Sequence, residues 1–214
     1  MAREYDLSVF INCPFDAAYR KLFYAIIFAV HDCGFIARSA LELTDTSQVR
    51  VNKILGIIAE CRVGIHDISR TELDAKSKLP RFNMPLELGM FLGAKEYGDK
   101  RQRQKICLVL DRSRFRYQKF CSDFAGQDIA AHERNVANAI NAVRDFLRSA
   151  APSNVLIPGA TKIQRRYARF SATVPALCRQ LGQKKAKLTF RDYTAFVARW
   201  LKQHAEPIRQ TASR

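Results

Sequence analysis

The sequence lacks a hydrophobic run long enough to cross a membrane. Its longest apolar run, Leu22–Val30, has nine residues, whereas a membrane-spanning helix needs about 20. The N-terminus places acidic residues before its first apolar stretch and has no small-residue cleavage site, so it does not resemble a secretory signal. We therefore expect a cytoplasmic protein that makes no membrane contact.

Metal-binding and several catalytic motifs are also missing. The six cysteines are scattered, without a Cys-x-x-Cys pair or a histidine at ligand spacing, which predicts free thiols and no metal site. There is no Gly-x-Ser-x-Gly elbow, no Walker loop and no Gly-x-Gly-x-x-Gly after the first predicted strand. The sequence therefore predicts no cofactor and gives no support to hydride transfer or ordinary kinase chemistry.

Acidic residues are scarce, and most of the imbalance lies in one part of the chain. The protein has 36 Lys and Arg against 20 Asp and Glu, a net charge of +16. Residues 151–214 hold 13 of the basic side chains, with Asp192 and Glu206 as their two acids. The composition changes where Pro152, Pro158 and Gly159 interrupt the chain, which is typical of a boundary. We therefore divide the protein into a domain over residues 1–150 and a basic extension over residues 151–214.

Short apolar strands alternate with amphipathic helices in residues 1–150. This alternation indicates βαβ crossovers, and hence an α/β fold in which helices cover both faces of a parallel sheet. The extension shows helical spacing, with a capping box at Thr189–Asp192. Strands are expected at 7–12, 35–38, 62–67 and 105–110, and helices at 17–32, 49–61, from 86 and at 135–147.

Polar residues follow the predicted strands at their carboxyl ends. In parallel sheets, ligands bind at this edge, where the order of the strands reverses. The rule selects Asn12, Cys13, Pro14, Phe15 and Asp16 after the first strand, together with His66 and Asp67 at the end of the third. We expect these residues to line a site, and we expect Asp111, which follows the fourth strand, to lie at the same edge.

Residues 81–93 form the densest cluster of unusual positions. Asn83, with Pro85 close behind, is expected to cap a helix. Glu87 then lies on a largely apolar helix face, where a carboxylate is costly unless it is paired or used. The structural alternative is that Glu87 only favours the helix N-terminus through the macrodipole.

Several of these segments resemble known families. The pattern Arg-x-Asn-x-x-x-Glu-Leu-Gly-x-Phe-x-Gly at 81–93 resembles the signature of the predicted nucleotide-binding TIR-like proteins of bacteria. Ser-Asp-Phe-Ala-Gly at 122–126 resembles a second block of the same proteins. Val-Phe-Ile-Asn-Cys-Pro-Phe at 9–15 is similar to the first-strand motif of nucleoside 2-deoxyribosyltransferases. The resemblance covers roughly residues 7–147 and implies a flavodoxin-like α/β fold.

The resemblance also implies an activity. Both groups cleave the N-glycosidic bond of NAD or a related nucleotide or nucleoside, and the TIR-like proteins occur in bacterial antiphage defence. They are commonly active only when assembled, which implies a homo-oligomer or a partner-gated state. Glu87 matches the catalytic carboxylate of these families, with the nucleotide or dinucleotide bound as substrate.

The resemblance suggests roles for further residues. Asn12 and Asp67 become candidates for holding the sugar, Phe15 for stacking on a base or for plain core packing, and Arg81 for meeting a phosphate. Residues 81–84 depart from the transferase motif, which has Asp, Ser, Gly and Thr before its Glu. This departure favours a TIR-like hydrolase over deoxyribosyl transfer and leaves an inactive domain open.

The basic extension supports an alternative of a different class. Its cations fit a phosphate backbone, whose binding falls with salt, or else the solvated face of a helical hairpin packed on the first domain. The alternative function is a non-catalytic nucleotide-sensing or nucleic-acid-binding module that uses the same cleft. A nucleic acid or another anionic partner would then bind along residues 162–187, through Lys162, Arg165, Arg166, Arg169, Lys184, Lys185 and Lys187.

Overall fold

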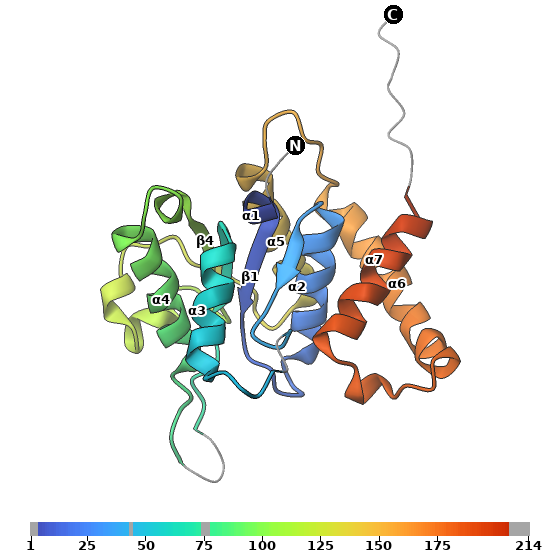
Figure 1. Cartoon of the computed structure of the whole chain (residues 1–214), viewed down its shortest axis with the longest axis horizontal. Coiled ribbons are helices and arrows are strands. Elements are labelled where there is room, and N and C mark those ends of the chain that lie inside the picture. Colours follow the sequence, from blue (N-terminus) through green and yellow to red (C-terminus); the bar gives the residue numbers. More distant parts are fainter. Residues whose placement is uncertain (1–3, 43–44, 74–77, 206–214) are drawn as a thin grey trace, which may run out of the picture.

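The computed structural model describes residues 4–42, 45–73 and 78–205. Five parallel strands form one sheet in the order β2-β1-β3-β4-β5, with helices on both faces (Figure 1). The α/β class predicted from the sequence is therefore confirmed. The strands are β1 (Ser8–Asn12), β2 (Ile36–Arg38), β3 (Val63–Asp67), β4 (Ile106–Asp111) and the short β5 (Ala130–Ala131), which the sequence pattern missed.

The strand order reverses between β1 and β3. β2 pairs with one side of β1 and β3 pairs with the other, so that Asn12 stands opposite His66 at their carboxyl ends. Helices α2 (Arg20–Asp32) and α5 (Val136–Ala150) pack on one face of the sheet, and α3 (Arg50–Glu60) and α4 (Asn83–Tyr97) pack on the other. The switch point thus lies where the sequence placed its candidate residues.

Helix α2 is buried on all sides because its sequence is apolar on all sides. Its buried residues span the run Leu22–Val30, which is more than one amphipathic stripe requires. The outer side of α2 packs against α6 (Ala160–Gln180) and α7 (Phe190–Gln203) (Figure 1). The ring of Phe28 lies 5.3 Å from that of Phe170 and 5.8 Å from that of Trp200. The C-terminal extension therefore forms a third layer that shares the core of the α/β domain.

One predicted cation of the extension is not on its solvated face. Arg166 lies with its guanidinium 3.4 Å from the Asp32 carboxylate and over the Trp200 ring, and its side chain is 12% exposed. By contrast, Arg165, Arg169, Lys184, Lys185 and Lys187 are exposed. Arg166 therefore links α6 to α2 and does not belong to the proposed basic surface.

Of the two helix caps expected above, one is present and one is not. Thr189 and Asp192 form the expected capping box of α7, and Asn135, where no cap was predicted, caps α5 through its side chain. Asn83, however, is the exposed first residue of α4, and Phe82 precedes it without a side-chain cap. Asn12 contacts this turn in a different way, because its amide donates to the Met84 carbonyl oxygen at 2.8 Å and leaves the N–H groups of the turn uncapped.

The remaining segments are short. A helix, α1 (Glu4–Leu7), precedes β1, and the connection from β4 to β5 contains two 3₁₀ turns, η2 (Arg116–Lys119) and η3 (Ser122–Phe124), instead of a helix. Further 3₁₀ turns are η1 (Gln102–Gln104) and η4 (Lys185–Lys187). The six cysteines are free thiols. In the described ranges, no helix is both long and apolar enough to span a bilayer.

A fully buried lysine lies at the amino edge of the sheet. Lys105 immediately precedes β4, and its ammonium donates to the backbone oxygens of Ile58, at 2.5 Å, and Cys61, at the end of α3. The Phe91 ring lies 4.6 Å from the ammonium nitrogen. Burial lowers the pKa of Lys105 to about 8. The side chain thus supplies the C-terminal carbonyls of α3 with donors they would otherwise lack.

Candidate active site

Asn12 connects three elements at the switch point. Its side-chain nitrogen lies 3.1 Å from Nδ1 of His66 and also donates to the Met84 carbonyl oxygen. His66 Nδ1 therefore accepts, and burial lowers the pKa of His66 to about 3, with the Lys105 charge adding to the effect. Asn12 and His66 are buried, neutral partners that fasten β1, β3 and α4 together.

Asp67 is the centre of a buried polar cluster that sequence reasoning missed in part. Its carboxylate accepts from the Tyr19 hydroxyl at 2.5 Å and from the Ser69 backbone N–H at 2.8 Å. His132 Nδ1 accepts from the Arg134 backbone N–H, so the ring proton is on Nε2, which lies 3.0 Å from Asp67 Oδ2 without good hydrogen-bond alignment. Tyr19 and His132 hold Asp67 from α2 and from the loop after β5.

Glu87 is buried on the side of α4 that faces the sheet. It is 5% exposed, and burial raises its pKa, with the Arg50 charge acting in the opposite direction. Throughout the described ranges, no group donates a hydrogen bond to its carboxylate. Burial raises the pKa of Cys13 well above its usual range, and the charges of Asp67 and Glu87 raise it further. Cys13 therefore lies within electrostatic reach of both carboxylates, at the carboxyl end of β1.

The other predicted site residues are not all in this cluster. Pro14 is buried next to Cys13, but Phe15 packs on Phe23 in a T-shaped contact at 5.4 Å and lines a separate cavity of about 120 Å³. Phe15 thus has the core role that was its alternative. Arg81 and Asn83 are exposed at the start of α4. The structure gathers Asn12, Cys13, Asp67 and Glu87 and leaves Phe15 outside.

Asp111 is at the predicted edge but has a partner that the sequence did not reveal. It is fully buried, and its Oδ1 accepts from the guanidinium of Arg116 and from the Arg112 backbone N–H. Asp111 Oδ2 has no hydrogen-bond partner, and burial raises the pKa of this carboxyl despite the arginine. Asp111 therefore holds the β4–β5 connection against the sheet.

A cleft of about 340 Å³, here called the arginine cleft, opens above Asp67. Its walls include Tyr19, Lys21, Arg70, Glu72, His132 and Arg134, at the N-termini of α2 and α5. Glu72 binds Arg112 at 2.7 Å and Arg134 at 3.0 Å, and lies 3.5 Å from Arg70. The cluster has more cations than acids, which suits an anion. Glu87 does not line this cleft.

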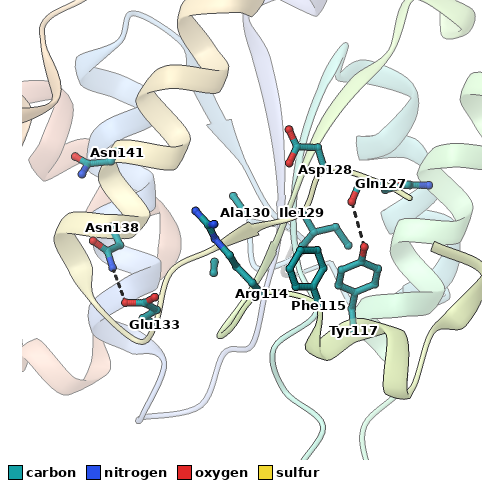
Figure 2. A pocket seen from close by; sticks show the side chains of 11 residues that line it. Arg114, Phe115, Tyr117, Gln127, Asp128, Ile129, Ala130, Glu133, Asn138 and Asn141 are labelled. Atoms are coloured by element: carbon teal, nitrogen blue, oxygen red, sulfur yellow. Dashed lines mark hydrogen bonds between the residues drawn. The ribbon is translucent and has the colours of Figure 1, made fainter. Parts of the chain in front are cut away.

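A larger cleft, of about 550 Å³, lies beside β5 (Figure 2). Asn138 and Asn141 of α5 face it from one side, and Phe115 and Tyr117 of the β4–β5 connection face it from the other (Figure 2). Phe115 is 67% exposed and has a φ of 59°, a strained conformation for an aromatic residue. None of the predicted site residues lines this cleft.

A comparison of the chain with models of protein families, with curated proteins and with solved structures found no match. The fold is therefore shown by the strand order and the helix layers, and the chain is assigned to no family.

Proposed function

We propose that the protein cleaves the N-glycosidic bond of NAD or a related nucleotide or nucleoside, with Glu87 as the catalytic carboxylate. The observation that carries the proposal is the environment of Glu87, which is buried at the switch point without a hydrogen-bond donor. A buried carboxylate in a purely structural role is normally satisfied, because removing it from water is costly. A largely buried carboxylate with a raised pKa and no donor among the described residues is instead typical of a functional group.

The chemistry suits a carboxylate of this kind. When the carbon–nitrogen bond breaks, the base leaves with the bonding electrons, and the sugar carbon becomes positively charged. The water that later attacks this carbon gives up a proton, which balances the proton taken up by the base of a nucleoside, whereas the nicotinamide of NAD leaves neutral and takes none. The Glu87 carboxylate can stabilise that charge or form a transient ester, and water then adds to the same carbon. Because the site is desolvated, the interaction is stronger than it would be in water. Asp67, fixed by Tyr19 and Ser69, is placed at the same edge to orient the sugar hydroxyls.

The burial of Glu87 also bears on regulation. It is 5% exposed and lines none of the clefts described above, so the proposal includes a movement of the surrounding chain that widens access for the substrate. This closed state agrees with the expectation that the protein acts as a homo-oligomer or when a partner opens it. An effector role in bacterial antiphage defence belongs to the same proposal.

The test is release of free base. The purified protein is incubated with NAD, nucleotides and nucleosides, alone and under conditions that favour assembly, and products are separated by chromatography. We expect Glu87→Gln to reduce release at least about 100-fold, as loss of a transition-state contact does. Glu96→Gln, an exposed glutamate on the same helix, is the matched control and should retain full activity. Equal activity of Glu87→Gln and the wild type would overturn the assignment.

The exposed cations of the extension favour a second candidate, a non-catalytic nucleotide-sensing or nucleic-acid-binding module. Arg165, Arg169, Lys184, Lys185 and Lys187 would contact phosphates, and binding to RNA or DNA would fall steeply with salt. Truncation at residue 151 is a poor test, because it removes the cover of α2. Charge reversal of Lys184 and Lys187 leaves the core intact. If base is never released and this reversal abolishes salt-dependent nucleic-acid binding, the second candidate replaces the first.

A further inference from the structure

The arginine cleft continues into a second cleft of different character. This second cleft, here called the tyrosine cleft, has a volume of about 440 Å³ and lies between α2 and the C-terminal helices. The two clefts share Lys21 of α2 and Val136, the first residue of α5, as wall residues. They therefore form one groove along α2, with a cationic end and an aromatic end.

The aromatic end presents rings to a ligand. The half-buried rings of Tyr24 and Tyr167 line it, and buried Tyr193 supports Tyr24 from behind, with the two rings stacked 3.9 Å apart at an angle of 11°. Two of the hydroxyls already donate to the backbone, that of Tyr167 to Lys21 at 3.3 Å and that of Tyr193 to Tyr24 at 3.3 Å. What remains for a ligand is flat apolar surface, which suits an aromatic ring.

The groove has an excess of positive charge. Arg20, Lys21 and Lys185 line the tyrosine cleft, and no acid is among its lining residues in the described ranges. Arg20 donates to the Ala186 carbonyl oxygen at 3.4 Å, which ties η4 and its Lys185 to α2. In the arginine cleft, Asp16 pairs with Arg70 and Glu72 with Arg134, so these charges offset one another and Lys21 supplies the excess. Lys21, at the junction of the two clefts, is therefore placed to meet an anion.

We propose that this groove binds a nucleoside phosphate, with the base against the tyrosines and the phosphate between Lys21 and the arginine cleft. The ligand class follows from the pairing of an aromatic cleft with an adjoining cationic one, joined at a single lysine. The site is separate from the one proposed for catalysis, because Glu87 lines neither cleft. It also requires the C-terminal extension, which supplies Tyr167, Lys185 and Tyr193.

Calorimetric titration of the full chain tests the proposal. The probes are AMP and UMP, with adenosine, ribose 5-phosphate and inorganic phosphate as the incomplete ligands. We expect the monophosphates to bind at least about tenfold more tightly than any incomplete ligand, since each lacks one half of the interaction. Affinity should fall as salt rises, because the phosphate contact is electrostatic. Equal binding of AMP and inorganic phosphate would show an unspecific anion site and overturn the proposal.

Variants locate the binding. Ser171→Trp fills the tyrosine cleft and should abolish binding, and the exposed pair Lys21→Ala and Lys185→Ala should weaken it about tenfold without affecting folding. Lys202→Ala, an exposed lysine outside both clefts, is the matched control. If the Lys21 and Lys185 pair binds like the wild type, or if a short single-stranded oligonucleotide binds about 100-fold more tightly than AMP, the proposal fails.

Discussion

Two buried charges at opposite edges of the sheet have opposite environments. At the amino edge, the ammonium of Lys105 has two carbonyl oxygens as acceptors and an aromatic ring beside it. At the carboxyl edge, the Glu87 carboxylate is nearly as buried and has no donor among the residues that the structure describes. The Lys105 ammonium is compensated by acceptors within the fold, whereas the Glu87 carboxylate has no such partner among the described residues. This difference, more than burial alone, is what supports the proposal of a functional role for Glu87.

The largest effect expected from this comparison is on stability, at Lys105. Lys105→Ala leaves the carbonyls of Ile58 and Cys61 without their donor and opens a cavity beside Phe91, so unfolding should become easier by about 3 kcal/mol. Lys100→Ala, an exposed neighbour, should change stability by less than about 0.5 kcal/mol. Chemical denaturation of both variants measures the difference. A loss at Lys105 no larger than that at Lys100 would mean that the buried ammonium is not a structural ion.

The two buried glutamates give the next largest effect. Glu42 is 8% exposed and accepts from Arg38 at 2.6 Å, so Glu42→Gln should cost about 2 kcal/mol. Glu87→Gln removes a buried charge that has no donor, and it should stabilise the protein by about 1 kcal/mol at neutral pH. The free energies of unfolding of the two variants should thus move in opposite directions. A destabilised Glu87→Gln would show that the carboxylate has a structural partner.

The smallest effect is a pH dependence. The folded state raises the pKa of Glu87 above its usual value of 4.5, so the native protein binds more protons than the unfolded chain above that value. The wild type should therefore lose stability relative to Glu87→Gln as the pH rises from about 4.5 through the raised pKa. Thermal unfolding of both proteins between pH 4 and pH 7 measures the difference. Parallel profiles would contradict the raised pKa and weaken the case for a catalytic carboxylate.

Local pattern was enough to predict most of the elements and the edge at which the candidate residues meet. Asn12, Asp67 and Asp111 were selected because they end apolar strands, and the register of β1 with β3 places Asn12 beside His66. Strand β5 was not predicted, because its two alanines show no alternation of apolar and polar residues. The cap expected at Asn83 is absent because α4 begins at Asn83 itself, and the contact of Asn12 with the Met84 carbonyl oxygen in this turn spans 72 residues of chain that no local pattern covers.

The partners of the buried charges could not be predicted in the same way. Tyr19 meets Asp67 across 48 residues of chain, and His132 approaches the same carboxylate from the loop after β5. Neither contact has a spacing that a sequence window could detect, because each depends on how separate layers pack. Phe15 illustrates the converse case, in which a residue next to the site in sequence turns away into the core on Phe23.

The burial of the apolar run Leu22–Val30 in α2 has a consequence for how the protein is made. A ribosome delivers the chain from its N-terminus, so the five strands and the helices that flank them emerge before α6 and α7. Until synthesis passes residue 203, the outer side of α2, with Phe28 at its centre, has no cover. The nascent domain therefore exposes an apolar helix surface until the extension has been synthesised. We expect chaperones that bind exposed apolar segments to associate with the chain during this interval. A ribosome stalled before α7 should leave an aggregation-prone product.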